Sequence, residues 1–179
     1  MNGFPPLVLP AAMKVTLVAM VAFAATTDLA ARRIPNWITA PGALLALALH
    51  AYYGGWRGAL AAVAGAALGF GIFLALYVAG GMGAGDVKLF AAVGAFTGPQ
   101  PLLLVFVLTG LLGGCAALVM AVARGRLRQT LSNTGRILAS AGALRFGEVR
   151  RSSALDAPGA LRLPYGAVIA GGTLLGLLL

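Results

Sequence analysis

The sequence predicts an all-α integral membrane protein, a bundle of about six transmembrane helices that forms a single domain over residues 1–179. Two properties of its composition predict this fold class. Hydrophobic residues make up 60% of the chain and charged residues only 9%, whereas soluble domains carry about 25% charged residues. The mean hydropathy is +0.95. A water-soluble globule is therefore excluded, and the net charge of +9 does not indicate a nucleic-acid partner in so apolar a chain.

The third observation is a series of apolar stretches, measured against the length that crosses a bilayer. A helix needs about 20 residues to cross a hydrocarbon core of about 30 Å. The candidate stretches are residues 7–31, 37–53, 59–80, 87–96, 102–123 and 163–179. The fourth is too short to cross alone, so we expect it to be extended by the glycine-rich residues before it, tilted, or buried among its neighbours.

The positions of the basic residues predict the orientation of the bundle. If the segments alternate in direction and the loop with Arg32 and Arg33 is cytoplasmic, only Lys14 and Arg57 lie on the other side. An excess of Lys and Arg marks cytoplasmic loops. We therefore predict a multi-pass protein of the inner (cytoplasmic) membrane with its N-terminus outside.

The one extended polar region is a basic cytoplasmic loop at residues 124–162. Its arginines outnumber Glu148 and Asp156, and its apolar residues recur at near-helical spacing. Such a pattern is typical of a helix lying on an anionic lipid surface. A solvated loop that obeys the positive-inside rule is the alternative, and the sequence leaves both open.

Small residues spaced four apart favour close contact between membrane helices. The pairs with this spacing are Gly65 and Gly69, Gly110 and Gly114, and Gly172 and Gly176. Cysteine chemistry is not expected, because Cys115 is the single cysteine and lies in an apolar stretch. A structural zinc site needs about four Cys or His ligands, so the sequence predicts neither a metal ion nor another cofactor.

Two carboxylates lie where charge is costly. Of the four acidic residues, Asp28 is near the end of the first apolar stretch and Asp86 is at the start of the fourth. An aspartate at the centre of a membrane helix costs a few kcal/mol, so both should lie near the cytoplasmic boundary. The predicted alternation places them on the same side of the bilayer at similar depth, where they could meet.

Two interpretations fit these aspartates. Two neighbouring acids cannot both ionise at low cost, so one keeps a proton and the pair can supply a general acid and a general base. Alternatively, each caps a helix or pairs with a nearby cation, Arg32 for Asp28 and Lys88 for Asp86. A proton or cation path through a non-enzymatic membrane subunit is a further use of such residues.

The sequence around each aspartate favours an active site. Gly83 and Gly85 precede Asp86, and glycine lets the backbone take positive φ and approach a bound chain closely. After Asp28, Pro35 and Asn36 indicate a turn that ends one helix and starts the next.

Together these residues resemble the type IV prepilin peptidase family, membrane aspartyl proteases that include the archaeal preflagellin peptidases. The family's hallmark is an aspartate followed after five residues by I-P-N, and then a second aspartate in G-x-G-D followed by V-K. Here Asp28 precedes I-P-N at residues 34–36, and Asp86 ends G-x-G-D and precedes V-K at residues 87–88. A weaker likeness is P-Y-G at residues 164–166, which opens the last apolar stretch.

The resemblance implies an aspartyl endopeptidase that removes the leader peptide of type IV prepilin-like precursors at the cytoplasmic membrane face. Asp28 and Asp86 would be the catalytic pair, and Gly83 and Gly85 would shape the loop that presents Asp86. We further infer that Lys88, Arg32 and Arg33 could steer an acidic residue near the start of the mature pilin, and the alternative role for the two arginines is a positive-inside anchor. The implied partners are prepilin-like precursors and membrane lipid, and no nucleic acid.

One departure from larger family members, and one from a different class of membrane protease, define which proteins this chain resembles. Larger family members carry a cytoplasmic domain with paired C-x-x-C motifs, and this chain resembles the short form associated with tight-adherence or Flp-type pili. Presenilin-like proteases share G-x-G-D but show a Y-D motif on the first catalytic helix, where this chain has Thr27-Asp28. The alternative from another class is a non-enzymatic membrane transport or assembly subunit that uses both aspartates to bind a cation or proton.

Overall fold

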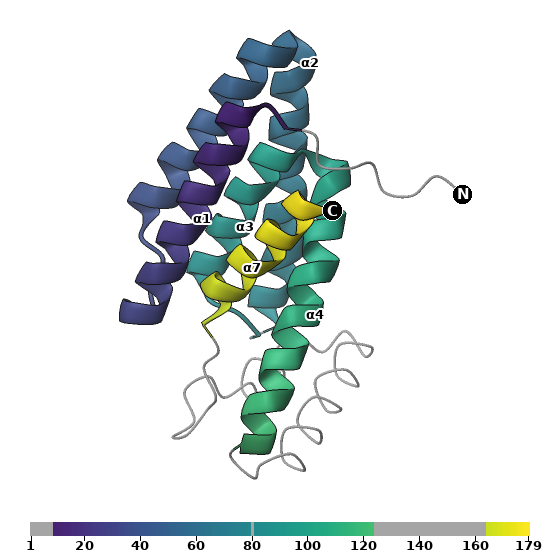
Figure 1. Cartoon of the computed structure of the whole chain (residues 1–179). Coiled ribbons are helices and arrows are strands. Elements are labelled where there is room, and N and C mark those ends of the chain that lie inside the picture. Colours follow the sequence, from purple (N-terminus) through teal and green to yellow (C-terminus); the bar gives the residue numbers. More distant parts are fainter. Residues whose placement is uncertain (1–8, 80, 124–163) are drawn as a thin grey trace, which may run out of the picture.

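The computed structural model describes residues 9–79, 81–123 and 164–179. These residues form helices and no strand, which confirms the all-α prediction. The helices are α1 (Ala11–Ala31), α2 (Asn36–Val78), α3 (Ala84–Thr97), α4 (Pro99–Ala123) and α7 (Tyr165–Leu178) (Figure 1). The basic loop expected at residues 124–162 lies outside the described part of the chain.

The count of about six transmembrane helices is not confirmed. Three helices of the described residues are long and apolar enough to cross a membrane, at Ala11–Ala31, Asn36–Val78 and Pro99–Met120. Part of the difference lies in α2, which includes both the second and the third expected segments. The sixth expected segment is the shorter apolar helix α7, Tyr165–Leu178.

Helix α2 contains a sharp bend at Gly55, where φ is 56° and ψ is −143°. That backbone conformation favours glycine because a Cβ would be strained there. A Cβ added to Gly58 would overlap the backbone oxygen of His50, more than two helical turns earlier. The chain therefore turns back on itself at Gly55, and the two arms of α2 lie side by side (Figure 1).

The second arm of α2 packs against α3 through glycines. A Cβ on Gly65 would overlap the backbone of Gly94, and one on Gly69 would lie 2.7 Å from the backbone oxygen of Phe90. Close approach of helix backbones at small residues is the usual way to pack helices in lipid. The fourth expected segment is thus explained by burial, because Leu89, Phe90 and most other residues of α3 are buried.

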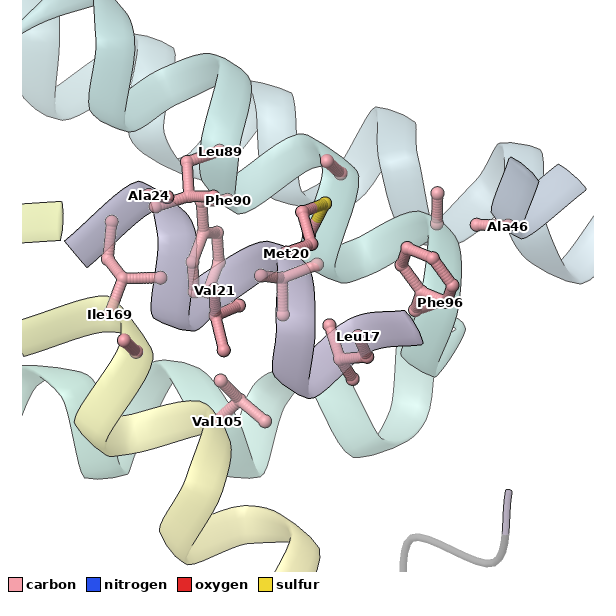
Figure 2. Close-up of a cluster of buried hydrophobic side chains, with 14 of the residues drawn as sticks. Leu17, Met20, Val21, Ala24, Ala46, Leu89, Phe90, Phe96, Val105 and Ile169 are labelled. Atoms are coloured by element: carbon pink, nitrogen blue, oxygen red, sulfur yellow. The ribbon is translucent and has the colours of Figure 1, made fainter. Parts of the chain in front are cut away.

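One apolar core joins the helices that carry the two aspartates. Figure 2 shows side chains from all five helices meeting in it, with the largest share from α1 and α3. Phe73 of α2 stacks on Phe90 of α3 with ring centroids 3.9 Å apart. This core fixes how far α1, α3 and α7 are displaced along one another, and so fixes the relative heights of their ends.

The side chain of His50 caps the C-terminal end of α3. The last carbonyl oxygens of a helix find no N–H donor within that helix. Nε2 of His50 lies 2.9 Å from the carbonyl oxygen of Phe96 and can pair with it. Gly98, with φ of 75°, then reverses the chain into α4. A helix of 14 residues therefore begins and ends within the bundle, about 21 Å long at 1.5 Å per residue.

Candidate active site

Asp28 lies in the last turns of α1 and is buried, with 7% of its surface exposed. The helix ends at Ala31, and Arg32 takes a left-handed conformation with φ of 53°. The backbone N–H of Arg32 donates to the backbone oxygen of Asp28 at 2.9 Å. Pro35 then stands as the N-cap of α2, so the expected turn between two helices is present.

Asp86 lies in the first turn of α3 and is 8% exposed. Its Oδ2 accepts the backbone N–H of Gly83 at 3.0 Å, which satisfies one of the free donors at the start of the helix. The capping alternative considered for Asp86 is therefore part of its role. The second alternative, an ion pair with Lys88, is not found among the described residues, where Lys88 binds a different side chain.

The positive φ expected of Gly83 and Gly85 is not found, and close approach to a bound chain stays a prediction. Gly83 has φ of −86°, and neither glycine is among the described residues with positive φ. Both glycines instead have little free space beside them. A Cβ on Gly83 would lie 3.2 Å from Oδ2 of Asp86, and one on Gly85 would lie 3.2 Å from Cβ of Ile34.

The two sequence motifs contact each other directly. Gly85 of G-x-G-D lies against Ile34 of I-P-N, and Nζ of Lys88 donates to Oδ1 of Asn36 at 2.9 Å. The segment after Asp28 is thus docked on the segment that carries Asp86. This contact brings the ends of α1 and α3 together.

Both aspartates line one open pocket of about 460 Å³. The remaining lining residues are 32–36, from the turn after α1, and 83–85, from the segment before Asp86. The structure therefore brings together Asp28, Asp86, Gly83, Gly85, Pro35 and Asn36, and Lys88 reaches the pocket wall through Asn36. The pocket holds acid groups, two arginines and glycine-lined walls at one end of the bundle.

The pocket changes the acidity of Asp86, which lies outside the three candidate membrane spans. Burial raises the pKa of Asp86 to about 6, the N–H of Gly83 opposes this shift, and the charge of Asp28 adds to it. A carboxyl with a raised pKa beside a second acid in one pocket is the arrangement in which one proton can be shared near neutral pH.

A third element reaches the site, and sequence reasoning gave it no role. The backbone N–H of Gly166, in the first turn of α7, donates to Oδ2 of Asp28 at 2.8 Å. The signal in the sequence was P-Y-G at residues 164–166, which was noted only as a weak likeness. Within the described residues no three His, Cys, Asp or Glu side chains are grouped so as to hold a metal ion.

Comparison with known proteins decides the family. Residues 15–118 match the family model of the type IV leader peptidase family, and this range is more than half of the chain. The chain belongs to the type IV leader peptidase family. No curated protein and no solved structure matches it.

The family match covers most of α1, all of α2 and α3, and most of α4. Both aspartates and both motifs around them lie within the matched range. Gly166 and the rest of α7 lie beyond its end at residue 118. Family membership implies a peptidase, and the long apolar helices indicate that it is a membrane protein.

Proposed function

We propose that this chain is a membrane-embedded aspartyl endopeptidase that removes the leader peptide from type IV prepilin-like precursors. The observation that carries the proposal is the shared pocket of Asp28 and Asp86. These residues come from different helices, are both buried, and interact electrostatically. In a leader peptidase, such a pair supplies the acid and the base of peptide hydrolysis.

The proposed reaction follows from a dyad that holds one proton. Asp28, in its ionised form, takes a proton from a water molecule, and the resulting hydroxide attacks the scissile carbonyl carbon. Asp86 gives its proton to the carbonyl oxygen, which yields a tetrahedral diol. The C–N bond then breaks as Asp28 passes its proton to the leaving amine and a diol hydroxyl returns one to Asp86, so the dyad is restored.

The pocket walls suit a substrate chain in an extended form. Gly83 and Gly85 leave room beside Asp86 because neither has a side chain, and the turn at 32–36 forms the opposite wall. Arg32 and Arg33 line the pocket and would attract an acidic residue near the start of the mature pilin. The ammonium group of Lys88 donates to Asn36 at the pocket wall, and its role in steering an acidic residue stays a prediction.

The proposed location is the cytoplasmic face of the inner membrane, with the N-terminus outside. Arg32 and Arg33 lie at the end of the bundle that carries the pocket, whereas Arg57 lies beside the bend of α2 at its other end. The positive-inside rule assigns the first end to the cytoplasm. Membrane lipid surrounds the apolar outer surface, where residues such as Leu111, Val119 and Val15 are exposed.

The experiment is co-expression of the chain with prepilin-like precursors from the same genome, followed by intact-mass analysis. We expect the mature pilin mass with the wild-type chain, and the precursor mass with Asp28→Asn or Asp86→Asn. The matched control is Asp156→Asn, the same change in the basic loop, which should process normally. Processing by either pocket variant at normal expression would contradict the aspartyl mechanism. No structural observation favours the non-enzymatic alternative, and the family implies a peptidase.

A further inference from the structure

We infer that the first turn of α7 is a third part of the active site and that Gly166 is the residue that positions Asp28 for catalysis. The contact between Gly166 and Asp28 stands on the structure alone. Its catalytic meaning rests on the proposed function. Gly166 lies outside the range matched by the family, which ends at residue 118.

The contact joins an N–H group at the start of a helix to a buried carboxylate. The N–H groups in the first turn of a helix have no acceptor within that helix, and a carboxylate buried away from water needs donors. The N–H of Gly166 meets Oδ2 of Asp28 at 2.8 Å across 138 residues of sequence, in a buried position. One hydrogen bond therefore gives an acceptor to an N–H group at the start of α7 and a donor to the carboxylate of Asp28.

The absence of a side chain at position 166 is necessary for this contact. A Cβ there would lie 2.9 Å from Cβ, 3.0 Å from Oδ2 and 3.1 Å from Cγ of Asp28. Cβ of Asp28 is fixed to the backbone of α1, so it cannot move aside as the tip of a flexible side chain can. Any larger residue must displace α7 or turn the carboxylate away from the N–H.

Helix α7 also packs against α4, away from Asp28. A Cβ on Gly172 would lie 2.8 Å from the backbone nitrogen of Thr109, and one on Gly176 would lie 3.0 Å from Val105. Helix α7 packs against both α4 and α1. The position from which Gly166 donates to Asp28 is therefore set in part by contacts with α4 that do not involve Asp28.

The two aspartates are held in the same way. Oδ2 of Asp86 accepts the N–H of Gly83 at the start of α3, and Oδ2 of Asp28 accepts the N–H of Gly166 at the start of α7. Each bond restricts rotation of its carboxyl group, so the dyad is oriented before substrate arrives. Gly166 is not among the residues that line the pocket, so we expect it not to contact the substrate. Loss of its hydrogen bond to Asp28 should therefore lower kcat and leave KM unchanged.

The contact itself can be measured without activity. Labelling with ¹³C′-tyrosine and ¹⁵N-glycine isolates the amides of glycines that follow tyrosine, which are Gly54 and Gly166 in this sequence. Gly54 lies at the bend of α2 and serves as an internal reference. In Asp28→Ala, hydrogen exchange at Gly166 should accelerate about tenfold or more, because a hydrogen bond to a charged group is lost. In Asp86→Ala it should stay at the wild-type rate, as should Gly54 in both variants.

The kinetic arm compares two glycines of the same helix. Gly166→Ala should lower kcat about 10- to 100-fold, the scale expected for a small misplacement of a catalytic group, with KM unchanged. Gly171→Ala is the matched control, because its Cβ would meet only the flexible tip of Leu112 at 3.2 Å, and it should keep the wild-type kcat. The exchange arm keeps the native Gly166, so it decides the contact even if Gly166→Ala does not fold.

Each outcome has a distinct meaning. Exchange at Gly166 that does not respond to Asp28→Ala, or a wild-type kcat in Gly166→Ala, overturns the inference. A loss confined to KM also overturns it, because that result places Gly166 in substrate binding. If the wild-type chain cleaves no precursor while Gly166 responds to Asp28→Ala, the contact is supported and the proposed function fails.

Discussion

Nζ of Lys88 and Oδ1 of Asn36 are joined by a hydrogen bond of 2.9 Å between residues 52 positions apart. Lys88 belongs to the segment that presents Asp86, and Asn36 opens α2 directly after the turn that follows Asp28. The bond therefore ties the segments that carry the two aspartates at the edge of the pocket. Gly85 beside Ile34 makes the second contact of the same interface.

Loss of the bond between Lys88 and Asn36 should reduce activity more than stability. The bond is exposed, and exposed charged contacts contribute about 0–1 kcal/mol to stability. We expect Lys88→Met to lower kcat about tenfold, because small displacements of catalytic groups are costly, while thermal unfolding changes little. Lys88→Arg keeps a charged donor and should recover most of the activity.

The matched control for this prediction is Lys14→Met, which makes the same change on α1 near the opposite end of the bundle. It should cleave the precursor at the wild-type rate. Equal losses in Lys88→Met and Lys88→Arg would show that this hydrogen bond does not set the geometry of the pocket.

The two aspartates should behave as one catalytic unit. Asp28→Asn and Asp86→Asn should each lower kcat/KM by at least about 10³-fold, and the double variant should be no worse than the single ones, because groups that act together are strongly non-additive. Purified protein in lipid nanodiscs, assayed with a precursor peptide, gives the three values. Multiplicative losses would mean that the carboxylates act in independent steps.

Much of this fold follows from sequence because membranes allow few structures. Lipid requires every backbone group to be paired within a segment, so apolar stretches become helices, and alternation of direction placed Asp28 and Asp86 at one end. The positions of the helices along one another do not follow from the sequence in this way, because they depend on packing between residues that are distant in the chain. Nothing in the sequence shows that Gly166 meets Asp28 or that Lys88 meets Asn36.

The glycine pairs show the same limit. Gly65 and Gly69 pack on α3, and Gly172 and Gly176 pack on α4, as their spacing predicted. Gly110 and Gly114 have the same spacing, yet a Cβ on either would meet no atom of the described residues within 4 Å, so this pair makes no close helix contact in the described part of the chain. Spacing marks a surface that permits close approach, and the partner is set by the rest of the bundle.

The orientation of the bundle can be tested with two arginines at opposite ends. In a Cys115→Ala background, Arg57→Cys should react with a membrane-impermeant maleimide in intact spheroplasts, because the bend of α2 faces outside in the predicted topology. Arg33→Cys, at the pocket, should react only after permeabilisation. The reversed pattern would place the pocket outside the cell and would contradict cleavage at the cytoplasmic face.

Asp86 should lower the stability of the folded protein at neutral pH. Burial raises its pKa to about 6, above the value of about 3.9 for an aspartate in an unfolded chain. Between these values the folded protein binds more protons than the unfolded one, so stability falls as pH rises through this range. Asp86→Asn removes the buried charge while its side-chain oxygen can still accept the N–H of Gly83, so this inactive variant should melt at a higher temperature than wild type at pH 7.5.

The difference in melting temperature between Asp86→Asn and wild type should shrink at pH 4.5, where the carboxyl of Asp86 is protonated in the folded protein because its pKa is about 6, so the folded state no longer carries the buried charge. Thermal unfolding in nanodiscs at the two pH values measures it. Asp156→Asn, in the basic loop, controls for the general effect of removing a carboxylate and should show no such pH dependence. An Asp86→Asn variant that is less stable than wild type at pH 7.5 would show that the charged form of Asp86 stabilises the fold. A buried acid that holds a proton is expected to lower the stability of the folded protein, as groups kept for activity often do. The melting temperatures at the two pH values distinguish this loss of stability from the stabilisation that Asp86 would give if it only capped α3.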